Sequence, residues 1–335
     1  MKILIVGGVA GGATAATRLR RLSEENEVII FEKGQYVSFA NCGLPYHISG
    51  TIDKRDALLL QTPESLKERY NLDVRVFTEV LSIYTDEKKI SVKNLQTGEI
   101  YLENYDKLLL SPGAEPIKPP FEGIDSDKIY TLRNIPDMDK IVAKTKNAQN
   151  FVVVGGGFIG LEVAENLIEA GKSVKLVELG NQVMAPVDFD IASFVHEKAK
   201  QKGLELLLNV GVEKFNDKGE TLEVFLNNGT SLETDAVILA IGVKPETKLA
   251  VEAGLEIGET RGILVNEFLQ TSNPDIYAVG DAIEVAHFIN NKKVLIPLAW
   301  PANRQGRIVA DNIVLGNQYK YSGSLGSSIL KFFEL

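Results

Sequence analysis

The sequence is poor in the residue types that most often build disulfide frameworks or metal sites. Its 335 residues include one cysteine, Cys42, and three histidines, His47, His196 and His287. A single cysteine excludes an internal disulfide and is typical of a protein from a reducing compartment. The histidines show no metal-ligand spacing, so we predict no metal and give them no role.

The sequence also lacks an excess of positive charge and any long apolar segment. Its 36 Lys and Arg are outnumbered by 45 Asp and Glu, a formal net charge of −9. This balance argues against nucleic-acid binding, because phosphate neutralisation requires a basic surface. The apolar run at residues 3–6 is too short, and too soon followed by glycine, for a signal peptide or a membrane span. We therefore expect a cytoplasmic protein with no membrane attachment.

One pattern occurs twice: a short apolar strand, a glycine-rich turn, a helix and a second strand. The two copies cover residues 2–32 and 151–178. Each copy opens a sheet of parallel strands, so the sequence predicts an α/β fold with two Rossmann-like dinucleotide-binding domains. Alternating apolar and polar residues at 72–105, 204–209 and 221–227 predict a small antiparallel sheet beside each parallel one.

Proline-containing connectors at residues 112–120 and 243–245 mark the expected crossings between the domains. We predict a discontinuous first domain at residues 1–112 and 246–322. The second domain is then inserted at residues 113–245, and residues 323–335 form a separate terminal segment.

The second unit contains a complete dinucleotide fingerprint. Gly155, Gly157 and Gly160 have G-x-G-x-x-G spacing between strand and helix. These glycines permit a tight turn, close approach of a pyrophosphate and close packing of helix on strand. Glu178 ends the next strand, where an acid accepts hydrogen bonds from an adenosine ribose. Because residues 179–182 contain no Arg to hold a 2′-phosphate, we predict NADH in preference to NADPH.

The first unit is less regular, because Gly7, Val9 and Gly12 occupy the three fingerprint positions. Gly8 and Gly11 add backbone freedom, and Glu32 stands at the acid position. In a third segment, residues 271–282, a short apolar run ends in Gly280 and Asp281. Two alternatives are a glycine-rich helix entrance without ligand and an Asp281 that is only a helix N-cap. Taken together, the segments predict a flavin site in which Asp281 holds ribityl hydroxyls.

The motifs VGGVAGGA, LLLSPGAEP, VVVGGGFIGLE, LAIGVKPET and IYAVGDA follow one another in this order. With them the chain resembles the FAD-dependent pyridine nucleotide-disulfide oxidoreductases over nearly its whole length. The resemblance implies a disulfide reductase type of fold, in which the first domain binds FAD and the inserted domain binds NAD(P)H. It implies FAD contacts at Gly7, Gly8, Val9, Ala10, Gly11, Gly12, Glu32, Lys33, Ser111, Pro112, Gly113, Gly280 and Asp281. It implies nicotinamide nucleotide contacts at Gly155, Gly157, Phe158, Ile159, Gly160, Glu162, Glu178 and Gly242, with Phe158 as an aromatic gate over the flavin.

The stretch SFANCGLPY, residues 38–46, resembles the single-cysteine branch of coenzyme A disulfide reductases and NADH-dependent persulfide reductases. With one thiol, Cys42 passes electrons only to an external acceptor. A mixed disulfide with coenzyme A, a persulfide and a sulfenic acid remain open. The oxidase and peroxidase relatives that use a sulfenic acid have a His where this chain has Ala10, which favours disulfide or persulfide reduction. We expect an oxidised flavin to lower the pKa of Cys42.

Arg18 and Arg21 lie three residues apart near the end of the first predicted helix, so they share a face. The resemblance implies that they contact the phosphates of coenzyme A, with Thr14, Ser38, Asn41 and Asn303 nearby. The alternative is a solvated helix end whose cations favour the helix dipole.

Members of the family continue into a C-terminal dimerisation domain, and residues 323–335 resemble its opening strand. The resemblance thus implies a truncated chain and a homodimer when that domain is present; whether a rhodanese domain follows stays open. The alternative function is a redox sensor that binds flavin and NADH without thiol turnover.

Overall fold

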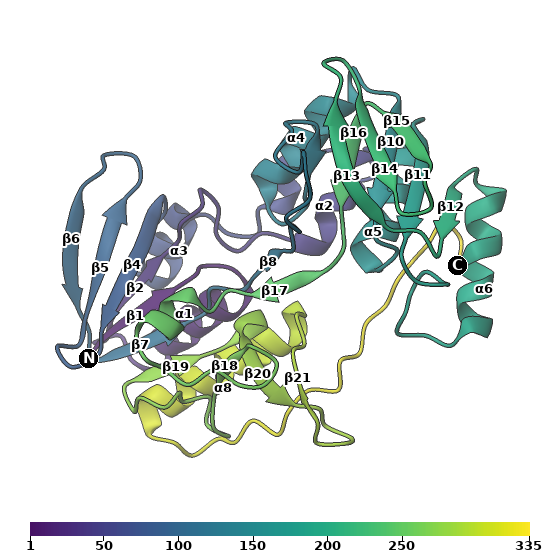
Figure 1. Ribbon diagram of the computed structural model, residues 1–335. Coiled ribbons are helices and arrows are strands. Elements are labelled where there is room, and N and C mark those ends of the chain that lie inside the picture. Colours follow the sequence, from purple (N-terminus) through teal and green to yellow (C-terminus); the bar gives the residue numbers. More distant parts are fainter. The chain divides into compact units, whose positions relative to one another are not determined.

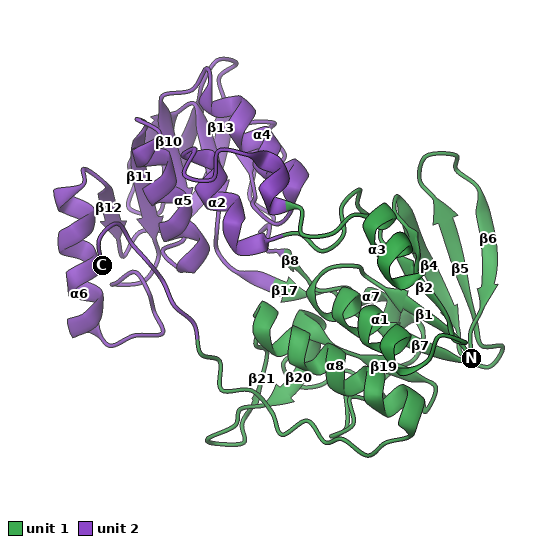
Figure 2. Ribbon diagram, turned by 180° about the vertical axis from the view of Figure 1, so that it is seen from behind, with its two compact units in different colours: residues 1–39, 59–115, 244–327 green, residues 40–58, 116–243, 328–335 purple.

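The computed structural model describes all 335 residues, and these divide into two compact units (Figure 2). Unit 1 comprises residues 1–39, 59–115 and 244–327, and unit 2 comprises residues 40–58, 116–243 and 328–335. The crossings at 115/116 and 243/244 lie in two short strands, β8 (Ala114–Pro116) and β17 (Val243–Pro245). The units differ from the predicted domains chiefly in that residues 40–58 and 328–335 pack with the inserted unit.

The main sheet of unit 1 has five parallel strands in the order β19-β7-β1-β2-β3 (Figure 1). They are β1 (Lys2–Val6), β2 (Glu27–Phe31), β3 (Asp73–Arg75), β7 (Lys107–Leu110) and β19 (Ile276–Ala278). The central strands read as continuous apolar runs, and Ile3, Leu4 and Ile5 are fully buried, as expected where a parallel sheet is covered on both faces. Helix α1 (Ala10–Leu22) packs on β1 and β2 and also on α8 (Ala299–Leu315).

Smaller elements complete unit 1. The predicted antiparallel sheet is confirmed for β4 (Thr78–Tyr84), β5 (Lys89–Asn94) and β6 (Ile100–Asn104). The prediction was wrong for residues 73–75, which form β3 and pair in parallel with β2. Helix α3 (Pro63–Tyr70) lies between β2 and β3 in the sequence, and a helical crossover of this kind joins parallel strands. The remaining elements are α7 (Lys248–Glu252), β18 (Ile263–Leu264), η3 (Gly280–Ala282), β20 (Ile283–Ala286) and β21 (Lys293–Val294).

Unit 2 repeats this architecture with a parallel sheet in the order β12-β11-β10-β16-β9. Its strands are β9 (Ile129–Tyr130), β10 (Asn150–Val154), β11 (Ser173–Glu178), β12 (Glu205–Leu208) and β16 (Ala236–Leu239). An antiparallel sheet follows, with β13 (Val212–Asp217), β14 (Leu222–Leu226) and β15 (Ser231–Thr234). The antiparallel prediction is confirmed for residues 222–226 but wrong for 205–208. Helix α6 (Phe189–Gln201) connects β11 to β12 and makes them parallel.

Two further parts of the chain pack within unit 2. Residues 40–58 form η1 (Asn41–Gly43), α2 (Leu44–Ile48) and η2 (Arg55–Leu58), and α2 lies against α4 (Ile135–Thr145) and α5 (Phe158–Glu169). In the terminal segment, the rings of Phe332 and Phe333 are buried. None of the helices in either unit combines the length and the apolar character needed to cross a bilayer.

Candidate functional site

Each main sheet presents its predicted site residues at the carboxyl ends of its strands. In unit 1, Gly7 follows β1, Glu32 follows β2, Ser111 follows β7 and Gly280 lies two residues after β19. In open sheets of parallel strands, ligands bind at this edge. Unit 1 therefore brings together the residues for which the sequence predicts a flavin site.

The first glycine-rich turn runs very close to neighbouring backbone. Gly7 has φ +97°, and a Cβ atom there would lie 2.1 Å from the Ser111 carbonyl oxygen. A Cβ atom at Gly12 would lie 1.9 Å from the carbonyl oxygen of Gly7. Only glycine fits at both positions. Val9 is the N-cap of α1, Ala10 is its first residue, and no side chain caps the helix. The missing middle glycine thus leaves the turn and the free helix N-terminus intact.

The carboxylate of Glu32 is fixed by two backbone donors. Gly8 N donates to Oε2 at 2.9 Å, and Gly34 N donates to Oε1 at 2.8 Å. Lys33 instead pairs with Glu79 at 2.8 Å and is largely exposed. Glu32 is therefore held in place beside the turn, and Gly34, which the sequence analysis missed, contributes to this.

Helix α8 also reaches the turn. Gln305 is buried, and its Oε1 accepts a hydrogen bond from Gly280 N at 2.7 Å. A Cβ atom at Gly306 would lie 2.5 Å from the Gly11 carbonyl oxygen, so α8 and α1 cross closely. The sequence analysis missed both residues; the available signal was a glycine in the middle of a long helix.

The local structure at Asp281 contradicts the alternative in which this residue is only a helix N-cap. Asp281 lies inside η3, whose N-cap is Val279, so Asp281 is not an N-cap. Gly280 and Gly113 have φ values of +82° and +78°, and Pro112 lies between Ser111 and Gly113 in the loop after β7. These loops belong to the same sheet edge as Gly7.

The glycine fingerprint of unit 2 shows three different environments. Gly155 has φ +104°, and a Cβ atom there would lie 2.4 Å from the Ala240 carbonyl oxygen. A Cβ atom at Gly160 would lie 1.9 Å from the Gly155 carbonyl oxygen, whereas one at Gly157 would meet nothing within 4 Å. Packing within the chain thus requires Gly155 and Gly160. The space above Gly157 is open, as close approach of a pyrophosphate demands.

Glu178 ends β11 beside this turn, and its carboxylate is fixed like that of Glu32. Gly156 N donates to Oε2 and Gly180 N donates to Oε1, both at 2.7 Å. Phe158 and Ile159 begin α5, and Glu162 lies one turn further along. Gly242, with φ +108°, follows β16 at the same edge. All predicted nicotinamide nucleotide contacts therefore lie in unit 2.

The predicted coenzyme A contacts fall into two groups. Thr14 Oγ1 donates to Asn303 Oδ1 at 2.7 Å, which joins α1 to α8. Arg18 pairs with Asp311 at 2.8 Å, whereas the guanidinium of Arg21 lies 5.8 Å from the ring centre of Tyr70. The two arginines thus have different partners in this structure. The other two predicted contacts lie in different units. Ser38, in unit 1, has φ +46°, and its N–H donates to the Gly8 carbonyl oxygen. Asn41 is exposed in η1 of unit 2.

Cys42 is free and exposed in η1, immediately before α2. Protein atoms on one side partly desolvate the thiol, and this effect, followed by the charge of Glu162, raises the pKa of Cys42. The expected lowering depended on an oxidised flavin; the chain alone shifts the pKa in the opposite direction.

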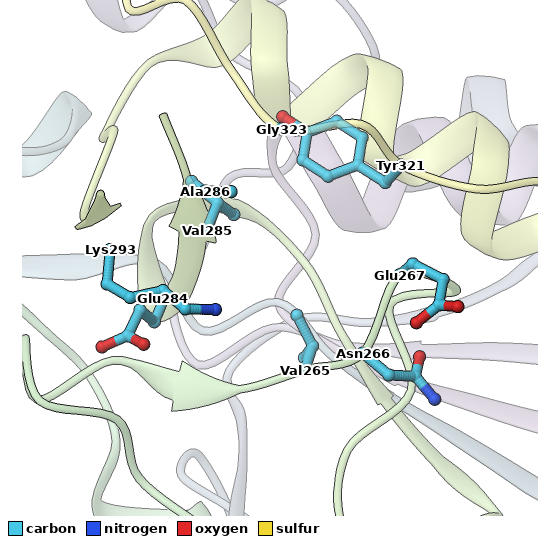
Figure 3. A pocket seen from close by; sticks show the side chains of 9 residues that line it. All are labelled: Val265, Asn266, Glu267, Glu284, Val285, Ala286, Lys293, Tyr321 and Gly323. Atoms are coloured by element: carbon cyan, nitrogen blue, oxygen red, sulfur yellow. The ribbon is translucent and has the colours of Figure 1, made fainter. Parts of the chain in front are cut away.

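One cavity in unit 1 lies apart from all of these residues. Its volume is about 190 Å³. Figure 3 shows its lining residues, Val265, Asn266, Glu267, Glu284, Val285, Ala286, Lys293, Tyr321 and Gly323. The buried Glu284 is satisfied, because Thr260 donates to it from both its N–H and its hydroxyl at 2.9 Å. No predicted site residue lines this cavity.

The model of the pyridine nucleotide-disulphide oxidoreductase family matches residues 1–306. The chain belongs to this family. A coenzyme A disulfide reductase of Staphylococcus aureus strain JH9 is 35% identical over 99% of the chain and 75% of that protein. The structure of the reduced Bacillus anthracis CoADR-RHD protein superimposes with TM-score 0.96, 52% identity and 99% coverage of the chain. A NAD-dependent persulfide reductase from A. fulgidus superimposes with TM-score 0.96, 34% identity and 100% coverage.

The chain spans 60% of the B. anthracis protein and 62% of the A. fulgidus protein. It is an oxidoreductase of the flavoprotein class, and the family implies FAD and NAD(P)H as cofactors. The residues fit both groups. Each unit has a glycine turn at a sheet edge, a helix N-terminus without a side-chain cap and a fixed carboxylate after the second strand.

Proposed function

We propose that the protein reduces coenzyme A disulfide, or a related persulfide or polysulfide, with electrons that pass from NADH through FAD to Cys42. The curated relative named above and the persulfide reductase structure support this chemistry. The observation that carries it is the place of Cys42, which precedes a helix packed on α5, the helix of the nucleotide fingerprint. Unit 1 would bind FAD and unit 2 NADH.

When bound, FAD takes up hydride from the nicotinamide and supplies an electron pair. In unit 1, backbone N–H groups at the start of α1 would hold the pyrophosphate, Glu32 the adenosine ribose and Asp281 the ribityl hydroxyls. In unit 2, the open face of Gly157 would receive the pyrophosphate of NADH. Phe158, the first residue of α5, would shield the flavin until the nicotinamide displaces the ring.

Cys42 would carry out the sulfur chemistry. Its thiolate attacks one sulfur of an external disulfide, the Cys42–sulfur bond forms, the original S–S bond breaks and one thiolate leaves. The electron pair then cleaves the mixed disulfide, which releases the second thiolate and restores Cys42. Arg18 and Arg21 would meet phosphates of coenzyme A, with Thr14, Ser38, Asn41 and Asn303 as further contacts. A homodimer and a cytoplasmic location stay predictions.

Steady-state oxidation of NADH by the FAD-loaded chain tests the proposal. Coenzyme A disulfide and an alkyl persulfide are supplied anaerobically, and oxygen alone is supplied in a third assay. Turnover with either sulfur substrate that disappears in Cys42→Ser supports the proposal. Turnover with oxygen alone, lost in the same variant, favours an oxidase that uses a sulfenic acid. No Cys42-dependent turnover with any acceptor favours the redox sensor.

A further inference from the structure

The loop that joins β11 to α6, residues 179–188, packs on the glycine turn of unit 2. Val183 is 0% exposed, and a Cβ atom added to Gly156 would lie 2.7 Å from Val183 Cγ1, so the two residues are in contact. The next residue, Met184, donates its N–H to the Gly156 carbonyl oxygen at 2.8 Å. We call this segment the β11–α6 loop. It holds one side of the turn that opens helix α5.

Gly156 is bonded on both sides. Its N–H donates to Glu178 Oε2 at 2.7 Å, and its carbonyl oxygen accepts from Met184 in the β11–α6 loop. That carbonyl shares a planar peptide group with the N–H of Gly157, the N-cap of α5, so the loop also sets the direction of this N–H. A shift of Gly156 would therefore disturb both the Glu178 carboxylate and the backbone at Gly157.

His196 anchors the β11–α6 loop to helix α6. The N–H of Val183 makes no backbone hydrogen bond and donates instead to His196 Nε2 at 3.2 Å. Because Val183 is fully buried, loss of this acceptor would leave its N–H without a partner, which costs free energy. The histidine side chain thus stabilises the position in which the loop contacts Gly156.

His196 accepts this hydrogen bond only in its neutral form. A neutral imidazole has one ring nitrogen that accepts, whereas both nitrogens of the imidazolium carry a proton and donate. Protonation of His196 would set two donors against each other at Val183. The surroundings favour the neutral form, because the ring of Phe189 lies 6.1 Å away, centre to centre, and burial lowers the pKa of His196 below 6.5.

No charged neighbour takes part in that shift, since burial is its only cause. Six charged groups lie on the loop, near His196 on α6, or on β11 and β12: Asp188, Glu197, Lys200, Lys175, Glu178 and Glu205. Lys175 and Glu205 pair with one another at 2.8 Å, and Glu178 is held by backbone donors. Further along α6, Glu334 of the terminal segment pairs with Lys198 and Lys202. His196 therefore responds to pH through its own ring.

We propose that His196 is a positioning residue for the nicotinamide nucleotide: its neutral ring holds the β11–α6 loop on Gly156 and so keeps the glycine turn and Glu178 in place. This inference rests on the proposed function, in which unit 2 binds NADH. Protonation of His196 releases Val183, so the affinity for the nucleotide falls as the pH drops below 6.5. The sequence alone indicated no role for His196, because its partner lies in a loop without a regular pattern.

Binding of ADP-ribose to the FAD-loaded chain tests the inference by calorimetry at pH 7.5 and pH 5. This probe has the pyrophosphate and adenosine ribose of NADH but no nicotinamide, so it cannot reduce FAD. In His196→Gln, the side-chain amide oxygen accepts from Val183 at either pH. Between the two pH values, the wild type should lose about fivefold more affinity than this variant, as expected for one hydrogen bond. His196→Leu, which has no acceptor, should bind about fivefold more weakly than the wild type at pH 7.5.

His287→Gln is the matched control. His287 belongs to unit 1, where its Nδ1 accepts from the N–H of Ile289 at 3.4 Å, so this variant should keep the pH profile of the wild type. Glu178 titrates in every variant, and the comparison between variants removes its contribution. An equal pH dependence in the wild type and His196→Gln, or wild-type affinity of His196→Leu at pH 7.5, would overturn the inference.

Amide hydrogen exchange of residues 179–188 tests the anchor without any nucleotide. At pH 7.5, exchange in the FAD-loaded chain should be about fivefold faster in His196→Leu than in the wild type, and His196→Gln should restore the slow rate. Equal exchange in all three proteins would contradict the anchor. Exchange that follows residue 196 in a chain that does not bind ADP-ribose would contradict the proposed NADH site. Binding that is indifferent to residue 196 would refute the role of His196 alone.

Discussion

Gly157 and Gly160 stand three residues apart in the fingerprint of unit 2, yet the chain restricts them in different ways. A Cβ atom at Gly160 would lie 1.9 Å from a backbone oxygen, and one at Gly157 would point into open space. We predict that Gly160→Ala lowers the free energy of unfolding by about 3 kcal/mol. Gly157→Ala should change it by less than about 1 kcal/mol, the effect expected at an N-cap, but should weaken NADH binding at least tenfold. Urea unfolding and NADH titration measure the two effects. Equal loss of stability in both variants would contradict this account.

We propose that the choice of nicotinamide cofactor depends on Glu178. Two backbone donors hold its carboxylate at the end of β11, where it would accept from the adenosine ribose and repel a 2′-phosphate. Glu178→Ala should raise the KM for NADH roughly tenfold, which corresponds to a loss of about 1.4 kcal/mol of binding free energy. The variant should also prefer NADH over NADPH less strongly than the wild type, as measured by kcat/KM for each cofactor. Lys175→Ala, on the same strand, serves as control. A ratio that does not move would show that Glu178 does not select the cofactor.

At the scale of elements, the crossing of α8 over α1 shapes the proposed FAD site. Gly306 allows α8 to approach the Gly11 carbonyl, and the neighbouring Gln305 accepts from Gly280. Gly306→Ala should push α8 away from the turn. The purified protein should then hold less than about half of the FAD of the wild type, judged from its flavin absorbance per chain. Arg304→Ala, an exposed position on the same helix, should retain full FAD content. Full FAD content in Gly306→Ala would contradict a role for this crossing.

Helix α5 carries a carboxyl group whose ionisation costs stability. The folded state raises the pKa of Glu162 from 4.5 to about 7. The folded chain therefore binds this proton more tightly than the unfolded chain, and the stability that the group contributes is lost as pH rises from 4.5 through 7. Glu162→Gln should gain stability relative to the wild type between pH 5 and pH 8. After allowance for solvent screening, we expect about 1 kcal/mol. Guanidinium unfolding at both pH values measures this, and a pH-independent difference would contradict it.

At the scale of the whole molecule, local patterns in the sequence predicted the features that depend on neighbouring residues. Both glycine turns could be located because each lies between a strand and a helix that are close in sequence. Residues 73–75 and 205–208 were expected in antiparallel sheets, because alternation shows that a strand has two different faces but does not reveal its partner. The helix before each of these strands was the better signal.

The sequence could not predict the contacts that bring distant segments together. The packing of residues 40–58 on α5 joins parts of the chain more than a hundred residues apart, and nothing in either segment alone indicates it. Burial in the folded unit, followed by the like charge of Glu165, raises the pKa of Glu162. The sequence does not show this burial, so a Glu in the motif GGGFIGLE was interpreted only as a cofactor contact. Gly306 was missed for the same reason, since its partner Gly11 lies near the other end of unit 1. Gln305 was missed because its partner Gly280 belongs to a different element, 25 residues earlier in the sequence.

The central claim concerns the whole molecule: one pair of electrons from NADH is stored on Cys42, in addition to the pair that FAD holds. Anaerobic titration of the FAD-loaded chain with NADH, after formation of the mixed disulfide with coenzyme A disulfide and removal of excess reagent, tests this most directly. The account predicts two equivalents of NADH per flavin in the wild type, release of one coenzyme A thiol, and one equivalent in Cys42→Ser. A titration that ends at one equivalent in both proteins, with no thiol released, would contradict it.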